Sequence, residues 1–307
     1  MGDVLSELSQ GLAGLVQRAG PSVVRVEGRR RGPSSGVAWS EGLIVTAGHV
    51  LEWDEGIRIG LADGGSATAS VVGRDPGTDL AVLRVDAPGL PLPAWSDGDE
   101  LDAGHLVLGL SRPGVRVRAS LGMVSVRGDA WWTPSGGRLD RDLRVDIGLH
   151  VGFSGSLLVD AAGRAVGINT AGLVRATPIV IPTATLRRVV GELVAHGHVR
   201  RGFLGIGTQA ARLPADAAQA TGQSAALLIT SVQPDTAASA AGLRLGDVLV
   251  SFAGQPVQHP ADLYPLLDEP RIGQTVTLKV LRAGRIEDVP LTVGARSVDR
   301  GQPGERP

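Results

Sequence analysis

Val45-Thr46-Ala47-Gly48-His49-Val50 is the first of three segments that decide how this chain is interpreted, and Gly77-Thr78-Asp79-Leu80-Ala81-Val82-Leu83 and Gly152-Phe153-Ser154-Gly155-Ser156 follow it. Each segment holds one reactive side chain among residues that favour a strand or a tight turn. A serine hydroxyl is a poor nucleophile unless a base contacts it, and the base needs an acceptor behind it to fix its tautomer. His49, Asp79 and Ser154 supply one candidate for each role, so the segments predict a serine nucleophile suited to peptide-bond hydrolysis.

The glycines around Ser154 have a purpose in this hypothesis. An attacking serine needs a tightly folded backbone whose amide groups converge on one point, and the N–H groups of Gly152 and Ser154 are the candidates. They would hold the oxyanion of the tetrahedral intermediate, while Gly155 lets the chain turn away without a clash. Taken singly, each reactive residue could be structural, because histidine, aspartate and Gly-Ser turns all have ordinary uses. Their order and their flanking glycines together favour catalysis.

Composition narrows the remaining possibilities. The chain has 307 residues, of which 43% are hydrophobic and 20% charged, so it can form a packed core. Its 44 glycines and 19 prolines predict the many turns of a mainly β protein. A formal net charge of −1 gives no electrostatic reason to expect nucleic acid as a partner. The lack of cysteine excludes disulfides, thiol catalysis and thiolate metal sites.

The N-terminal residues predict a helix rather than a targeting segment. No basic segment precedes an apolar one there, and no apolar run reaches the roughly 18 residues of a membrane span. We therefore expect a cytoplasmic location and no membrane span. Residues 3–19 predict an amphipathic helix with an apolar stripe formed by Val4, Leu5, Leu8, Leu12, Leu15 and Val16. This helix either packs on its own domain or contacts a neighbouring subunit, and the sequence leaves the two possibilities level.

After Pro21 the pattern changes to short β-type runs separated by turn residues, which predicts a barrel or sandwich. The candidate strands are Ser22–Val26, Gly36–Trp39, Leu43–Thr46, Ile57–Leu61, Thr68–Val72, Leu80–Val85, His105–Leu110, Gly122–Val126, Leu143–Val145, Ser156–Val159 and Ala165–Asn169. Pro182 to His196 then predicts a helix that Gly197 ends. We place the N-terminal helix at residues 1–20 and the first domain at residues 21–199.

Residues 200–296 form a second predicted domain. Its candidate strands are Leu227–Val232, Val248–Phe252 and Thr275–Leu281, with short helical segments near Thr236–Ala241 and Ala261–Leu267. Residues 297–307 are rich in Gly, Pro and charge and are expected to fray. His196 and His198 suggest a metal site, but a helix C-terminus favours histidine through its dipole, and neither a cysteine nor a nearby cluster of acids completes a site. We expect no metal and no cofactor.

Longer matches carry a family resemblance. Residues 21–296 resemble the HtrA/Deg family of serine proteases, in which a trypsin-like double β-barrel precedes a single PDZ domain. Residues 44–50 are similar to the family's histidine strand, and residues 74–83 are similar to its aspartate segment. Residues 163–171 resemble the strand that lines the substrate cleft, and residues 200–206 resemble the entry into the PDZ domain. The resemblance implies a serine endopeptidase that acts on unfolded or exposed polypeptides.

The nucleophile segment departs from the family pattern. Gly-Asn-Ser-Gly-Gly-Pro-Leu is usual there, and this chain has Gly-Phe-Ser-Gly-Ser-Leu-Leu at residues 152–158. Phe153 must find room beside the cleft, and Ser156 would be strained if its position requires a positive φ. None of these changes removes a reacting group, so catalysis is the expectation. The alternative is a catalytically lapsed, protease-like protein that binds peptides or acts as a chaperone.

The resemblance also suggests where a substrate side chain would bind. In the trypsin-like arrangement the residue six positions before the nucleophile lies at the base of the specificity pocket, and here it is Gly148. A pocket for Lys or Arg is not expected, because no acid occupies that position. Ile168 and Thr170 complete the predicted pocket, which favours cleavage after small or aliphatic residues. The tryptophans of the segment 127–141, Trp131 and Trp132, either form a pocket or fold onto the barrel, and we favour the second.

The second domain implies a peptide-binding site. Phe203, Leu204, Gly205 and Ile206 resemble the carboxylate-binding turn of PDZ domains, where backbone N–H groups capture a peptide C-terminus. Leu263 and Leu266 either line the groove or belong to the core. The family resemblance further implies a homotrimer or a larger homo-oligomer.

Overall fold

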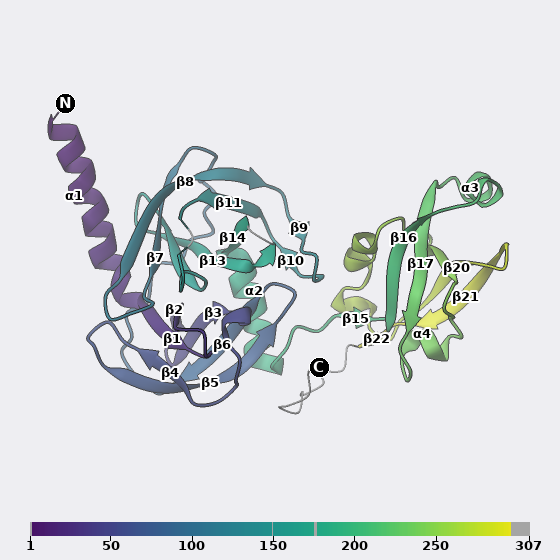
Figure 1. Ribbon diagram of the computed structural model, residues 1–307, viewed down its shortest axis with the longest axis horizontal. Coiled ribbons are helices and arrows are strands. Elements are labelled where there is room, and N and C mark those ends of the chain that lie inside the picture. The colour runs from purple at the N-terminus through teal and green to yellow at the C-terminus, as the bar shows by residue number, and fades with distance from the viewer. Residues whose placement is uncertain (1, 149, 175–176, 296–307) are drawn as a thin grey trace. The chain divides into compact units, whose positions relative to one another are not determined.

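The computed structural model describes residues 2–148, 150–174 and 177–295. The chain divides into two compact units, Met1–Val199 and Arg200–Pro307. The expected tail at residues 297–307 lies outside the described residues. The first unit holds two closed barrels, and the second holds one open sheet with short helices (Figure 1). The predicted mainly β fold, a double barrel followed by an α+β region, is confirmed.

Six antiparallel strands close the first barrel in the order β1-β2-β3-β6-β5-β4. Side chains alternate across each strand, so Val24 and Val26 of β1 enter the interior while Val23 faces a second core shared with the other barrel. All six strands fall where the sequence predicts them: β1 (Val23–Glu27), β2 (Ser34–Ser40), β3 (Leu43–Ala47), β4 (Ile57–Gly60), β5 (Ser66–Asp75) and β6 (Leu80–Val85).

The second barrel has the order β11-β14-β13-β12-β7-β8. Its strands are β7 (Leu106–Ser111), β8 (Arg118–Gly128), β11 (Asp142–Asp146), β12 (Ser156–Asp160), β13 (Ala165–Val174) and β14 (Thr177–Pro182). The sequence did not predict β14, because its prolines, Pro178 and Pro182, argue against a strand. Pairing with β13 along most of its length overrides that local signal. A two-stranded hairpin, β9 (Trp131–Trp132) and β10 (Arg138–Leu139), projects between β8 and β11.

Two α-helices complete the first unit. The α2 helix (Thr183–His196) ends at Gly197, which has a φ of 76°, as predicted. The N-terminal helix α1 (Gly2–Ala19) packs on its own unit through its C-terminal half, where Leu15 and Ala19 are buried in the shared core. Its first turns extend from the barrels with their side chains exposed (Figure 1). Two 3-10 helices, η1 (Gly20–Ser22) and η2 (Gly48–Val50), flank β1 and β3.

The second unit is a sheet in the order β16-β17-β18-β20-β21, with β19 paired to β18 and a separate β15-β22 pair. The elements are β15 (Gly202–Phe203), β16 (Ile206–Arg212), α3 (Ala215–Thr221), β17 (Ala225–Val232), α4 (Ala237–Ala240), β18 (Val248–Phe252), β19 (Gln255–Pro256), η3 (Pro260–Leu266), η4 (Glu269–Arg271), β20 (Thr275–Arg282), β21 (Arg285–Thr292) and β22 (Gly294–Ala295). The predicted helix near residues 261–267 is the 3-10 helix η3, which contains Pro265. Sequence reasoning missed β16, α3 and β21.

Candidate active site

His49 and Asp79 meet because two neighbouring strands of the first barrel place them there. His49 lies in η2, just after β3, and Asp79 directly precedes β6. These strands pair in register, with Ala47 opposite Leu80. Asp79 Oδ1 accepts a hydrogen bond from the His49 backbone N–H at 2.8 Å, and Asp79 Oδ2 lies 2.7 Å from His49 Nδ1. The carboxylate therefore engages Nδ1, which leaves Nε2 as the nitrogen able to accept a proton.

A further donor from the second barrel holds Asp79 in place. The Thr170 hydroxyl on β13 donates to Asp79 Oδ2, and the Gly172 N–H donates to the Thr170 hydroxyl at 2.9 Å. Asp79 itself is 6% exposed and has a φ of 56°, a left-handed conformation that is uncommon outside glycine. Thr170 is predicted to line the specificity pocket, but in the structure its side chain is buried and its hydroxyl contacts the carboxylate.

Ser154 is connected to the His49–Asp79 pair through two residues of β13. The Ala171 N–H donates to Ser154 Oγ at 3.4 Å. The next residue, Gly172, lies so close to the pair that a Cβ atom there would collide with His49 Nδ1 and Asp79 Oδ2. One short segment of β13 therefore contacts all three predicted catalytic residues. It lies beside the His49–Asp79 pair of the first barrel and beside the serine that precedes β12 of the second.

Two of the three substitutions that depart from the family pattern, Phe153 and Ser156, are accommodated without crowding the site. Phe153 is 2% exposed and points into the second barrel, where its ring occupies space left by Gly109. Ser156 begins β12 as ordinary extended strand, and its hydroxyl accepts a hydrogen bond from Asn169 Nδ2 at 3.0 Å. The positive φ values of this turn fall on Gly152 (86°) and Gly155 (82°).

The residues predicted to form the specificity pocket lie in different environments. Gly148 is exposed, and the position of a Cβ atom on it would lie 3.1 Å from His150 Nε2. Ile168, by contrast, has no exposed surface and belongs to the core between the barrels. It therefore does not line an open pocket, because the alternation along β13 turns its side chain inward.

The β9–β10 hairpin supports the aspartate from outside the barrel. The hydroxyl of Thr133, a fully buried residue, donates to the Gly77 carbonyl at 2.7 Å and accepts from the Gly137 N–H at 3.0 Å. Gly77 precedes Asp79 by two residues, so the hairpin braces the turn that carries the carboxylate. Trp131 packs against the core, which agrees with the prediction for that tryptophan. Sequence reasoning gave Thr133 no role.

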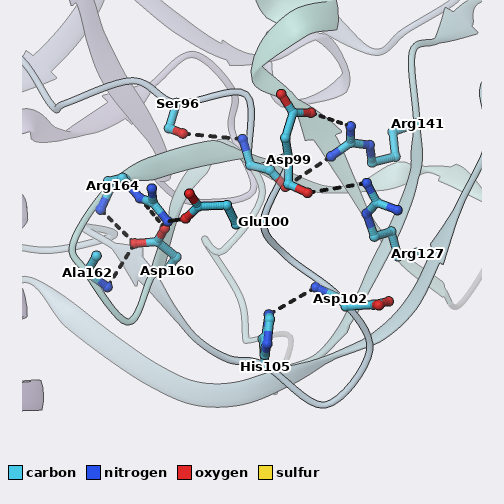
Figure 2. Close-up of polar contacts among 11 residues, drawn as sticks. Ser96, Asp99, Glu100, Asp102, His105, Arg127, Arg141, Asp160, Ala162 and Arg164 are labelled. Carbon is cyan, nitrogen blue, oxygen red and sulfur yellow. Dashed lines mark hydrogen bonds and ion pairs between the residues drawn. The ribbon is translucent and has the colours of Figure 1, made fainter.

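Ion pairs close the far end of the hairpin that β12 and β13 form (Figure 2). Asp160 accepts from the Ala162 N–H at 3.0 Å and from Arg164 Nε at 2.7 Å, and Arg164 Nη2 lies 2.7 Å from Glu100 Oε2. Hydrogen bonds to Glu100 and Asp160 raise the pKa of Arg164. This network fixes the turn between the two strands that lead to and from the site. Among the described residues, no group of acidic or histidine side chains could hold a metal ion.

The predicted peptide-binding residues of the second unit lie around the start of β16. Phe203 ends β15, Leu204 and Gly205 form the connection, and Ile206 begins β16. The carbonyls of Leu204 and Gly205 accept hydrogen bonds from the segment 233–238, which anchors the turn. Two further predicted residues, Leu263 and Leu266, are each 6% exposed and belong to the core, which favours the core alternative for both.

Comparisons with known proteins agree with this architecture. A model described as a trypsin-like peptidase domain matches residues 34–168, and a PDZ domain model matches residues 202–293. The solved structure of the HtrA-type protease AlgW with tripeptide is 31% identical with a TM-score of 0.70, and the match covers 93% of this chain and 97% of that one. A serine endoprotease from Yersinia pestis is 29% identical with a TM-score of 0.71, covering 92% and 97% of the two chains.

Curated relatives include a probable periplasmic serine endoprotease, DegP-like, from Brucella suis, which is 31% identical over 89% of this chain and 54% of its own length. A protein of the same name from a Marinomonas species is 31% identical over 89% of this chain and 59% of its own. The chain thus spans little more than half the length of these relatives. Their periplasmic names leave the expected cytoplasmic location unsupported. No described helix is long and apolar enough to cross a membrane.

Proposed function

We propose that this chain, which belongs to the HtrA family of serine proteases and combines a trypsin-like domain with a PDZ domain, is an endopeptidase that cleaves unfolded or exposed polypeptides. The observation that carries the proposal is the 2.7 Å contact between His49 Nδ1 and Asp79 Oδ2. Ser154 Oγ accepts a hydrogen bond from Ala171, and the next residue of β13, Gly172, lies against that pair.

In the proposed mechanism His49 Nε2 accepts the proton of the Ser154 hydroxyl as Oγ attacks the carbonyl carbon of the substrate. Asp79 keeps the second imidazole proton on Nδ1 and stabilises the imidazolium that forms. The N–H groups of Gly152 and Ser154 stabilise the oxyanion, a contribution of roughly 2.7–4 kcal/mol per donor in comparable sites. The imidazolium then protonates the leaving amine, and water releases the acyl group by the same steps.

Fluorophosphonate labelling and casein digestion test this proposal together. We expect the wild type to digest casein and to be labelled at Ser154, since an activated serine reacts with such a phosphonate. Ser154→Ala should lose both properties, while Ser70→Ala, which changes an exposed serine on β5, should keep both. A folded wild type that takes no label and leaves casein intact would support the alternative of a lapsed protease that binds peptides.

We also propose that the second unit binds peptide C-termini through the turn 203–206, with the peptide added as a strand along β16. Support comes from the sheet order, in which β16 is an edge strand paired with β17. Gly205→Val should abolish binding, because Gly205 has a φ of 81° and a side chain there would collide with Thr236. Fluorescence anisotropy should show that a peptide with a free C-terminus binds and its amidated form does not. Equal binding of the two forms would contradict the proposal.

Assembly into a homotrimer or a larger homo-oligomer is a further proposal, supported by the exposed apolar stripe at the start of α1. Val4 and Leu5 are each 67% exposed and Leu8 is 45% exposed. Unpartnered apolar residues of this kind favour burial against another chain. Light scattering coupled to gel filtration should show an oligomer for the wild type and a smaller species for Leu5→Gln/Leu8→Gln. A monomeric wild type would overturn the assembly and leave the catalytic proposal standing.

A further inference from the structure

We propose that Ser34 and Ser35, at the start of β2, are positioning residues that orient the peptide groups of the nucleophile turn, with Arg112 as the anchor of Ser35. The nucleophile turn is residues 152–155. The inference rests on the proposed peptidase function of Ser154, and it assigns a role to residues that the catalytic proposal does not use.

Both serines reach from the first barrel to the turn that begins the nucleophile strand of the second. The Ser34 hydroxyl donates to the Ser154 carbonyl at 2.7 Å, and the Ser35 hydroxyl donates to the Gly152 carbonyl at 2.8 Å. The Ser35 backbone N–H also donates to the Ser154 carbonyl, at 3.3 Å. Neither serine has exposed surface, so these hydrogen bonds are shielded from competing water.

These two carbonyls belong to the peptide groups on either side of the one that carries the Ser154 N–H, a donor of the proposed oxyanion site. A peptide group is planar, so fixing a carbonyl fixes the N–H of the following residue as well. On the other side of these planes the Phe153 N–H donates to the His150 carbonyl at 3.0 Å, and the Gly155 N–H donates to the Asn169 carbonyl at 2.8 Å. The peptide groups 152–153 and 154–155 are thus held at both ends. The Ser154 N–H lies between them and has little freedom to rotate.

Such a restraint is needed because glycine occupies two of the four positions of the turn. Gly152 and Gly155 have φ values of 86° and 82°, which glycine adopts readily but also leaves readily. A catalytic amide is useful only when it is aimed before the charge develops. The serine hydroxyls supply a preorganisation that the turn sequence alone does not provide.

Arg112 determines which way the Ser35 hydroxyl points. The Arg112 backbone N–H donates to Ser35 Oγ at 2.9 Å, so the hydroxyl proton is directed to the Gly152 carbonyl. The side chain, in a residue 5% exposed, donates to the carbonyls of Gly20 at 3.0 Å, Val23 at 2.6 Å and Val115 at 2.7 Å. Burial lowers the pKa of this guanidinium. Two of these acceptors, Gly20 and Val23, therefore hold the Arg112 side chain at the junction between α1 and β1, and the third, Val115, ties it to its own loop.

The experiment compares Ser35→Ala with Ser22→Ala in the full-length chain. Ser22 is a matched control, because it is buried and its hydroxyl donates to the Ala19 carbonyl at 2.7 Å rather than to the nucleophile turn. Hydrolysis of a peptide substrate gives kcat and KM, and inhibition by a peptidyl boronate reports affinity for a tetrahedral adduct. Thermal unfolding measures stability separately.

We expect Ser35→Ala to lower kcat by roughly 10- to 100-fold, because small misplacements of a catalytic group cost about that much. KM should stay within about 3-fold of the wild type, and boronate affinity should fall in step with kcat, because both depend on the oxyanion donors. Ser22→Ala should keep kcat, KM and boronate affinity near those of the wild type even if it unfolds at a lower temperature.

A folded Ser35→Ala variant with unchanged kcat would overturn the inference, as would an equal loss of kcat in the Ser22→Ala control. If Ser35→Ala does not fold, Ser34→Ala decides the matter by the same criteria, since its hydroxyl makes one hydrogen bond to the turn. An inactive wild type that Ser154-directed phosphonates do not label would instead overturn the proposed function.

Discussion

At the residue scale, Asp79 is the most constrained member of the site. It combines a left-handed backbone with hydrogen bonds from the His49 backbone, the His49 ring and the Thr170 hydroxyl. These donors fix the orientation of the carboxylate, and the carboxylate fixes the imidazole tautomer. The position therefore requires a side chain that accepts at both of its oxygens.

Asp79→Asn should lower kcat by about 10⁴-fold with the fold retained, because an amide NH2 group at the position of Oδ2 donates to His49 Nδ1 instead of accepting from it, which favours the wrong tautomer. Peptide hydrolysis followed over the accessible pH range measures the loss, and circular dichroism checks the fold. Asp86→Asn, at an exposed position, is the matched control and should change neither kcat nor the fold. A variant within about 10-fold of the wild type would show that Asp79 does not orient His49.

At the scale of elements, the nucleophile turn depends on the fit between Phe153 and strand β7. A Cβ atom on Gly109 would lie 2.5 Å from Phe153 Cζ and 3.0 Å from Ile147 Cδ1. The chain therefore places its largest turn residue opposite a strand position that has no side chain. This pairing connects the packing of the second barrel with the geometry around Ser154.

Gly109→Ala should destabilise the first unit by about 1–3 kcal/mol, the usual cost of overpacking a core. Phe153→Leu should relieve part of that cost, so a double-mutant cycle measured by denaturant unfolding should show favourable coupling. Gly114→Ala is the control, because nothing lies within 4 Å of a Cβ atom there. Additive effects of the two substitutions would show that the ring does not occupy this space.

The β9–β10 hairpin gives a second prediction at this scale. Thr133→Val keeps the shape but leaves the Gly77 carbonyl and the Gly137 N–H without their hydroxyl partner, at a cost of about 1–3 kcal/mol. Because the Gly77 turn leads to Asp79, kcat should fall as well. Thr133→Ser, which keeps the hydroxyl, should retain most of the stability and most of kcat, as measured by unfolding and peptidase assays. Loss of stability with an unaltered kcat would mean that the hairpin does not brace the aspartate.

At the scale of the whole molecule, the chain has two units with separate cores, and the second unit contains its own buried ion pair. Asp247 is 3% exposed and accepts from Arg282 Nε at 2.9 Å, from Arg282 Nη2 at 2.7 Å and from the Arg244 N–H at 2.8 Å. Burial alone would raise the pKa of Asp247, but these hydrogen bonds outweigh it, so the pKa is lowered. The folded second unit thus binds a proton at this site less readily than the unfolded chain.

A lowered pKa contributes stability above the unfolded-state pKa, and that stability disappears as the pH falls through the folded-state pKa. Acidification below about pH 4 should therefore lower the unfolding temperature of the second unit, since an unperturbed aspartate titrates there. Calorimetry of the full chain measures this transition. Asp247→Asn should lower the unfolding temperature of the second unit at neutral pH and remove this part of the pH dependence of that temperature. Asp288→Asn, which alters an exposed pair with Lys279, should do little.

Much of the fold and of the candidate site was predictable from local sequence. Short β-type runs separated by turn residues predicted the strands of the first barrel, and Gly197 predicted the end of α2. The types and order of His49, Asp79 and Ser154 predicted their chemistry, because each stands in a segment whose conformation nearby residues favour. The prolines of β14 prevented its prediction as a strand, and the predicted helix near residues 261–267 is a 3-10 helix. In both places long-range pairing and packing outweigh local preference.

Only the tertiary structure decided which distant side chains meet. Ser35 and Gly152 are 117 residues apart, and Thr170 and Asp79 are 91 apart, so no local pattern could pair them. The same closure of the barrels buried Ile168 and placed the Thr170 hydroxyl where it donates a hydrogen bond to Asp79. A sequence determines reactive groups and strands because these depend on neighbours along the chain. Contacts across the two barrels depend on register and closure, which are properties of the folded whole.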